Sequence, residues 1–239
     1  MSGMSSPEHT TGHTTLGVAW EGARQAEMSA GIIGPEPCCF FMRFPLLCAV
    51  AWMAAVSPLF AEGITIVLDF QGPHSEQSIA EMKREFAGIM KGSTLRFDFR
   101  SRSEAARVTS DNLMVVRFKG KCVFEPIPYL IDERGPMAFT YTTDGEVQPF
   151  SEVECGRVIQ AMRPAMAGGD FGKGDVLLGR ALGRVLAHEV VHILSKSGQH
   201  GASGVAKTAL SGSQLIAPEL RLEPEDLERI TGGVLRRSN

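Results

Sequence analysis

Ala187-His188-Glu189-Val190-Val191-His192 is the stretch of this 239-residue chain that decides both its fold and its chemistry. Two histidines four residues apart on a helix project from the same face, so both imidazoles can reach one metal ion. Glu189 lies beside that face, where its carboxylate can take a proton from a water molecule held by the ion. The pattern therefore predicts a helix that carries a zinc site with its own general base. Such a site requires one more protein ligand.

The residues around this motif predict a long helix from about Val176 to Lys196. Its apolar residues recur three and four positions apart and form one stripe, which we expect to dock on a sheet. The stripe consists of Leu178, Leu182, Leu186, Val190 and Ile193. We expect the Asp175 carboxylate to cap the first turn and Gly198 to end the helix in a left-handed conformation.

The segments before this helix predict a sheet and one further main helix. A β-branched run at 64–70 indicates a buried strand, and the apolar spacing over 75–90 indicates an amphipathic helix. Three more strands are expected at 95–100, 112–119 and 137–143, with a short helix at 156–162. The predicted fold class is α+β, with a mixed twisted sheet of about four to five strands packed on two main helices. The second of these helices carries the motif.

The loop that leads into the motif helix is rich in glycine but does not fit a nucleotide-binding loop. In Gly168-Gly169-Asp170-Phe171-Gly172-Lys173-Gly174, the lysine is followed by Gly174 instead of Ser or Thr. The leading glycine of a P-loop would fall on Ala167. We therefore interpret this stretch as a flexible lead-in to the helix.

The third ligand has one candidate directly after the helix and several acidic alternatives further on. His200 follows His192 by eight residues, and imidazole is a common zinc ligand. Glu219 is the best acidic alternative because it closes an apolar stretch, although flanking prolines disfavour a long helix there. The other acidic candidates are Glu223, Glu225, Asp226 and Glu228. The position of His200 next to the helix end makes it the favoured ligand.

His188-Glu189-Val190-Val191-His192 resembles the defining motif of the zincin metallopeptidases, and the order of elements over 62–201 is similar to that of the metzincin branch. In that branch a third histidine follows the second by six residues, and a methionine turn lies beneath the metal. Here the spacing is eight residues, and no methionine follows Met166. Leu210 or Leu215 is expected in the place of that methionine. The chain therefore resembles a divergent, metzincin-like zincin. The gluzincin branch, which uses a later glutamate such as Glu219, is the alternative.

The resemblance implies a zinc metalloendopeptidase that hydrolyses peptide bonds by Glu189-assisted attack of zinc-bound water. It implies His188, His192 and His200 as metal ligands, and a substrate that adds as a strand along 137–143. The candidates for the donor to the developing oxyanion are Tyr129, Tyr141 and Lys207. Two alternatives stay open, namely a zinc-binding structural or interaction protein without turnover and a zinc-free domain with a chance motif.

The distribution of histidines disfavours a chance motif. Residues 62–239 contain four histidines, and three of them fall between 188 and 200. The fourth, His74, stands alone after a turn and is expected to have a structural role only.

The N-terminal segment has the features of a targeting sequence. Residues 1–41 show no apolar periodicity and are expected to be disordered or a mis-annotated leader. Met42-Arg43, an apolar run over 44–60 and then Ala61 indicate a signal peptide cleaved after Ala61. This predicts a single domain at 62–239 that is secreted or periplasmic. The alternative is an uncleaved signal segment that anchors the protein in the membrane.

Charge and cysteine content indicate which partners and which cellular compartment to expect. A formal net charge of -3 gives no indication of a nucleic-acid partner, so we expect a peptide or protein partner and membrane contact only through the signal segment. Cys38, Cys39 and Cys48 fall within the segment expected to be lost. In an exported protein, Cys122 and Cys155 are then expected to form a disulfide that closes a loop of about 33 residues. Two buried free thiols are the alternative.

Overall fold

The computed structural model describes residues 63–107, 110, 112–125 and 135–235, so the expected leader and signal segment lie outside the described residues. None of the described helices is long and apolar enough to cross a membrane. The strands are β1 (Gly63–Phe70), β2 (Arg96–Ser101), β3 (Leu113–Lys119), β4 (Ala138–Thr143) and β5 (Glu146–Glu154). The helices are α1 (Glu76–Met90), α2 (Arg102–Ala105), α3 (Cys155–Met162), α4 (Gly174–Ser195), α5 (Gly212–Ile216) and α6 (Pro224–Leu235), with 3-10 turns η1 (Arg163–Ala165) and η2 (Gly168–Lys173) before α4.

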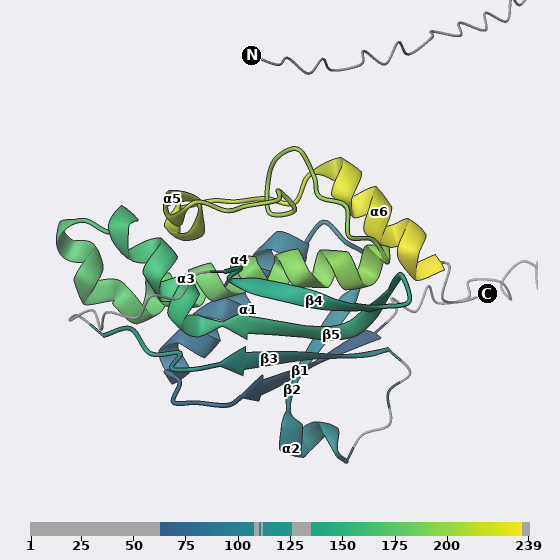
Figure 1. The fold of residues 1–239 in the computed structure, drawn as a ribbon, viewed down its shortest axis with the longest axis horizontal. Coiled ribbons are helices and arrows are strands. Elements are labelled where there is room, and N and C mark those ends of the chain that lie inside the picture. The colour runs from purple at the N-terminus through teal and green to yellow at the C-terminus, as the bar shows by residue number, and fades with distance from the viewer. Residues whose placement is uncertain (1–62, 108–109, 111, 126–134, 236–239) are drawn as a thin grey trace, which may run out of the picture. The chain divides into compact units, whose positions relative to one another are not determined.

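The five strands form one sheet in the order β2-β1-β3-β5-β4 (Figure 1). β1 pairs in parallel with β2 and β3, and β3 pairs in parallel with β5. Only β4 is antiparallel to its neighbour, and it lies at the edge of the sheet. The expected mixed sheet packed on helices is therefore confirmed, and so is the expectation that 137–143 contributes an edge strand.

Strand β5 was not expected from the sequence and lies between β3 and β4 in the sheet. Its sequence contains Pro149 and the charged Glu152, which are unusual in an inner strand. Pro149 is tolerated because the β4–β5 register is irregular between Thr140 and Thr142, and pairing with β3 begins only at Phe150. Glu152 is tolerated because it faces Arg117 at 3.2 Å on the open side of the sheet.

The core lies between one face of the sheet and the helices α1 and α4. Alternate residues of β1, namely Ile64, Ile66 and Leu68, belong to this core. All five residues of the predicted stripe on α4 are fully buried in it: Leu178, Leu182, Leu186, Val190 and Ile193. At about 1.5–3 kcal/mol for each fully buried large aliphatic side chain, this stripe is a main source of the energy that fixes α4 on the sheet.

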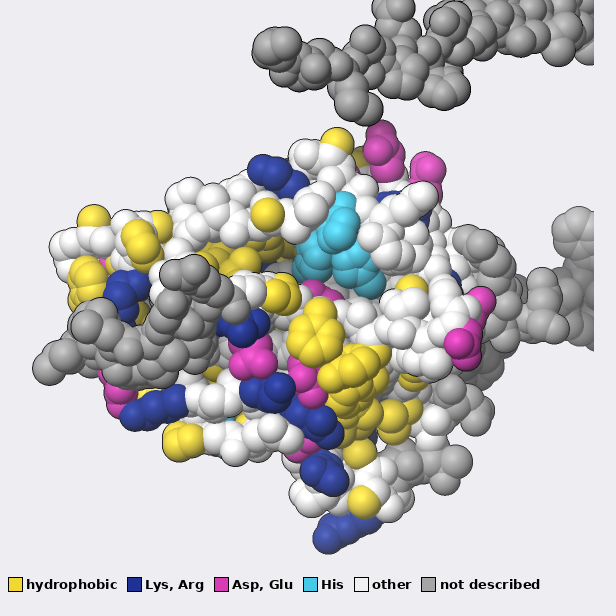
Figure 2. Space-filling view, viewed as in Figure 1, with side chains coloured by type: hydrophobic (Ala, Val, Ile, Leu, Met, Phe, Trp, Pro, Cys, Tyr) yellow, Lys and Arg dark blue, Asp and Glu magenta, His cyan; other side chains and the backbone are white. Residues whose placement is uncertain are grey.

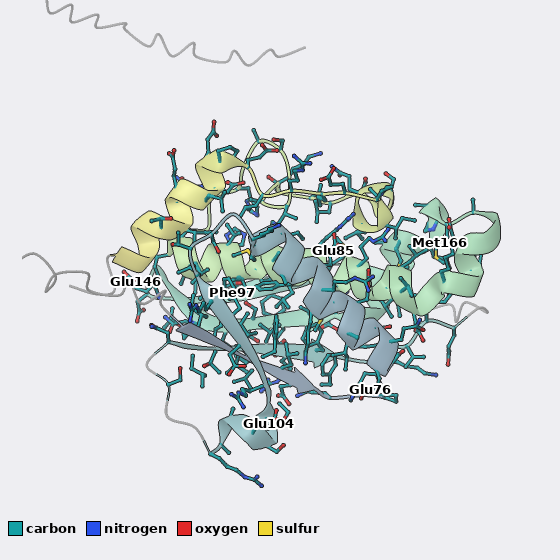
Figure 3. All side chains as sticks on the ribbon, turned by 180° about the vertical axis from the view of Figure 1, so that it is seen from behind. Glu76, Glu85, Phe97, Glu104, Glu146 and Met166 are labelled. Carbon is teal, nitrogen blue, oxygen red and sulfur yellow. A yellow bond between two sulfur atoms is a disulfide. The ribbon has the colours of Figure 1, made fainter. Side chains whose placement is uncertain are left out.

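Helices α1 and α4 approach closely because glycines occupy their contact (Figure 1 and Figure 3). A Cβ on Gly183 would lie 2.7 Å from the Met82 carbonyl oxygen of α1, and one on Gly179 would overlap the Ser78 carbonyl oxygen. Next to Gly183, the fully buried Arg184 donates to Glu85 of α1 at 2.7 Å. This ion pair and the glycine contacts together fix the position and rotation of α4 against α1.

The two ends of α4 differ from expectation. Asp175 does not cap the helix: α4 begins at Gly174, and the Asp175 carboxylate instead accepts the Phe124 backbone N–H at 2.9 Å. Gly198 does not end the helix either. Lys196 takes the left-handed conformation, with φ 54° and ψ 37°, and its N–H donates to the His192 carbonyl. The turn comes directly after Ser195, two residues before the glycine.

The expected disulfide between Cys122 and Cys155 is confirmed. It ties the segment after β3 to the first residue of α3, across 33 positions of sequence. His74 lies outside the group of three histidines that could hold a metal ion. Its ring makes a tilted contact with the Phe70 ring, with the centroids 4.6 Å apart, and its Nδ1 lies 3.1 Å from the Gly72 carbonyl oxygen.

Candidate metal centre

Three histidines converge at the C-terminal half of α4. His188 and His192 stand one turn apart on the helix, and His200 approaches from the loop that follows. Each of them offers a ring nitrogen, and these nitrogens all lie within 4.8 Å of one another. Figure 2 shows histidine side chains gathered at one place on the surface, beside an apolar patch. Among the described residues, these three form the group of His, Cys, Asp and Glu side chains placed to hold a metal ion.

The two helix histidines are oriented by backbone carbonyls of the loop that carries His200. His192 Nδ1 lies 2.7 Å from the Ser197 carbonyl oxygen, and His188 Nδ1 lies 2.9 Å from that of Val205. A carbonyl oxygen only accepts, so each Nδ1 carries the proton and each Nε2 presents a lone pair. Ser197 and Val205 lie on either side of His200 in the sequence. The same two bonds therefore set the tautomers and hold both ends of the loop.

The two Nε2 atoms face each other at 3.1 Å. Two neutral imidazoles that point lone pairs at one another repel, unless a cation lies between or beside them. Burial lowers the pKa of His188 to about 4, and it also lowers the pKa of His192, so neither ring carries a charge near neutral pH. The arrangement leaves two neutral, pre-oriented nitrogen donors, which is the state in which histidine binds a metal.

Glu189 is 4% exposed and its carboxylate contacts the edge strand β4. The Thr140 hydroxyl donates to its Oε2 at 2.6 Å, and Thr140 Oγ1 lies 2.7 Å from the Ser151 hydroxyl of β5. Because Thr140 has only one hydroxyl proton, Ser151 must donate to Thr140. Burial raises the pKa of Glu189 to about 7, and the Thr140 hydrogen bond partly opposes that rise. A carboxyl with this pKa takes up and releases protons near neutrality.

Two cavities open on the site. One of about 290 Å³ lies along β4 and is lined by all three histidines, Glu189 and Thr140. The other, of about 260 Å³, begins at His188 and Glu189 and is lined mainly by apolar residues of α4, the start of β4 and the loops: Pro136, Met137, Ala138, Val185, Ala209 and Leu210. Lys207 and Thr208 complete the lining of this second cavity. The site is therefore a cleft with room on both sides of Glu189.

Most acidic candidates for a third ligand lie elsewhere. Glu219 is exposed and pairs with Arg221 at 2.6 Å, and Glu223 accepts from Ser203 at 3.0 Å. Asp226 pairs with Arg229. In the described part of the chain, none of the acids proposed as ligands belongs to the histidine group. The geometry favours His200.

The three candidates for the oxyanion donor occupy different positions. Tyr129 lies outside the described residues. Tyr141 lies on the opposite face of β4 from Thr140 and packs in tilted ring contacts with Phe139 and Phe150. Lys207 is exposed and lines the second cavity next to His188 and Glu189. Leu210 and Leu215 were the two residues expected in place of the methionine beneath the metal. Leu210 lines that same cavity, whereas Leu215 is fully buried in the core.

Sequence reasoning missed the polar residues that hold the site together. Thr140 and Ser151 come from strands that pair at a point no local pattern specifies, and the Ser197 and Val205 contacts use backbone atoms. The alternation of Thr140 and Thr142 with aromatic residues was the one available signal, because it placed the threonines on a single face.

The sequence matches no protein-family model and no curated protein. Among solved structures, the chain is similar to archaemetzincin from Methanopyrus kandleri, with 8% sequence identity and a TM-score of 0.49. The alignment covers 73% of this chain and 97% of that chain.

Proposed function

We propose that this protein is a zinc-dependent metallopeptidase whose metal ligands are His188, His192 and His200 and whose general base is Glu189. The observation that carries the proposal is the pair of Nε2 atoms 3.1 Å apart, with each Nδ1 fixed by a backbone carbonyl. Neutral imidazoles suit zinc, and three protein ligands leave a position free for water, as catalytic zinc sites require. The site also fits the divergent metzincin-like zincin that the sequence resembles.

A zinc ion bound at this site would supply Lewis acidity and lower the pKa of water at its open position. Glu189 is the residue that accepts the proton of that water. Its carboxyl lies next to His188 in sequence, lines both cavities and has a pKa of about 7. The same carboxyl then returns the proton to the nitrogen of the leaving amine. Thr140 keeps the carboxylate oriented during this cycle through its hydrogen bond to Oε2.

The substrate is a peptide that lies in the cleft along β4. Among the described strands this one has a partner on one side only, so the backbone groups of its other edge can pair with an extended chain. Ala138, Phe139, Thr140 and Thr142 of β4 line the cavity that contains the three histidines. A peptide bound in this way passes directly over the site, with its side chains entering the two cavities.

The test combines metal analysis with peptide cleavage on residues 62–239. We expect about one zinc ion per chain, hydrolysis of a peptide library, and loss of hydrolysis but not of zinc in Glu189→Ala. Glu85→Ala is an unsuitable control because it unpairs the buried Arg184, whereas the exposed Glu225→Ala removes a carboxylate without touching the site. Zinc binding without cleavage would favour a structural or interaction protein. Absence of zinc would overturn the proposal, as would full activity in Glu189→Ala.

Export is part of the proposal. The disulfide between Cys122 and Cys155 supports an oxidising compartment, where such bonds form and persist. The signal segment proposed at 42–61 would deliver the chain there, to the periplasm or the outside of the cell, and cleavage would leave Glu62 as the first residue. Mass spectrometry of the mature N-terminus tests this, because a retained segment would indicate a membrane anchor instead.

A further inference from the structure

Helix α6 follows the site in the sequence and has a buried acidic residue in its first turn. Asp226 is 2% exposed and forms an ion pair with Arg229 one turn along the same helix. Arg229 also donates to the Gln199 carbonyl oxygen at 3.1 Å. Gln199 directly precedes His200. One arginine therefore connects the Asp226 carboxylate to the backbone that carries the third histidine.

The Asp226 carboxylate also packs on the other neighbour of His200. A Cβ built on Gly201 would lie 3.0 Å from Oδ1 and 3.1 Å from Oδ2 of Asp226, so the absence of a side chain lets the carboxylate approach the backbone. The Gly201 N–H donates to the Ala206 carbonyl at 2.8 Å, which closes the loop on the next residue after Val205. The residues before and after His200 are therefore both in contact with this pair.

One oxygen of Asp226 lacks a partner. Oδ2 is buried and accepts no hydrogen bond from the described residues. A buried carboxylate with an unsatisfied oxygen costs free energy, so its presence calls for a role beyond the stability of α6. The carboxylate lies beside the Gly201 backbone, directly after His200 in the sequence.

We infer that Asp226, held by Arg229, positions His200 for a metal dication bound by the three histidines. This inference rests on the proposed zinc site. Partners that hold a metal ligand in place without binding the metal themselves raise the affinity of the site. Asp226 is a positioning residue, since it lies outside the histidine group.

The first experiment measures zinc affinity by competition with a chelator in Asp226→Asn, which keeps the shape of the side chain and removes its charge. We expect a loss of about 10–100-fold, the range typical for partners that support metal ligands. The matched control is Glu225→Gln, which removes an exposed charge from the same turn of α6. Its affinity should stay within about twofold of the wild type, since surface charges are screened.

A double-mutant cycle with His200→Ala separates positioning from general electrostatics. If Asp226 acts mainly through His200, Asp226→Asn changes affinity far less in the His200→Ala background than in the wild type. Equal losses in the two backgrounds would overturn the positioning role, and so would equal affinities of Asp226→Asn and Glu225→Gln.

Hydrogen exchange in the metal-free protein gives a readout that does not depend on zinc. Asp226→Ala should speed exchange of the Gly201 amide more than Glu225→Ala does, because the carboxylate and Arg229 no longer hold the loop. Unchanged exchange at Gly201 would overturn the inference. If the wild type bound no zinc, the proposed function would fail, and this comparison would still decide whether Asp226 orders the His200 loop.

Discussion

His188 Nε2 lies 3.1 Å from His192 Nε2, and the Nδ1 atom of each ring contacts a backbone carbonyl oxygen. This single relationship fixes the tautomer of both rings, closes the loop between Ser197 and Val205, and creates a pair of facing lone pairs. The two helix histidines consequently have a structural role in the metal-free protein as well as a proposed role as ligands. His200 is exposed and has the second role only.

The three histidines should therefore respond differently to substitution by alanine. Each substitution removes a ligand, so each should lower zinc affinity by more than the ~10–100-fold cost of losing an outer partner. In the metal-free protein, His188→Ala or His192→Ala also frees a loop carbonyl and should cost about 1–3 kcal/mol of unfolding free energy. His200→Ala should stay within about 0.5 kcal/mol of the wild type. Chelator competition and urea unfolding with EDTA measure the two effects, and equal destabilisation by all three would contradict this division.

The raised pKa of Glu189 makes metal-free stability depend on pH. Its pKa is about 7 in the folded protein, against an ordinary value of 4.5 for the unfolded chain, so between these values the folded state binds more protons. Its contribution to stability is present at low pH and lost as pH rises through 7, by about 3 kcal/mol at most. Glu189→Gln removes this loss, and the variant should be more stable than the wild type at pH 8 and nearly equal to it at about pH 4.5.

His188 makes the free energy of unfolding depend on pH in the opposite direction. Its pKa falls from 6.5 to about 4 on folding, so its contribution is present above 6.5 and is lost as pH falls toward 4. In the wild type the two slopes partly cancel between 4.5 and 6.5. Glu189→Gln keeps only the histidine slope, so its stability should fall steadily on acidification. Urea unfolding with EDTA at several pH values checks this, and parallel curves for the two proteins would rule it out.

The sequence predicted those parts of the fold that local patterns determine. The stripe on α4 and the helical histidine spacing were both readable, because each depends on positions three and four residues apart. β5 was missed because its buried Ser151 and Glu152 are stabilised by neighbours from other strands, Thr140 and Arg117. The end of α4 was placed at Gly198 because glycine favours the left-handed conformation, yet Lys196 adopts it.

The sequence was enough to predict the metal ligands, but not the hydrogen bonds that hold them and Glu189 in place. Nothing local indicates that Thr140 meets Glu189, 49 positions away, or that Arg229 reaches Gln199. Such contacts arise from strand register and from the docking of α6, which a single sequence does not specify.

Thr140 should control the protonation of Glu189. Its hydroxyl stabilises the ionised carboxylate, so Thr140→Val should raise the pKa of Glu189 further and cost about 1–3 kcal/mol of stability at pH 8. The cost should shrink near pH 5, where Glu189 is protonated in both proteins. Thr140→Ser keeps the hydroxyl and serves as the control. The measurement is the difference in unfolding free energy between the two variants across this range, and a difference that did not change with pH would refute the role.

The disulfide should stabilise the fold without contributing to the metal site. Cys122 and Cys155 join the segment after β3 to α3, whereas the histidines lie on α4 and the loop after it. For a closed loop of 33 positions, the chain-entropy relation gives about 4 kcal/mol. Replacing both cysteines by serine should therefore lower the free energy of unfolding by roughly 2–5 kcal/mol, as removal of a native disulfide typically does. Under conditions where this variant is folded, its zinc affinity should match that of the wild type. A large drop in affinity would show that the bond supports the site through α3 and α4, which are in contact.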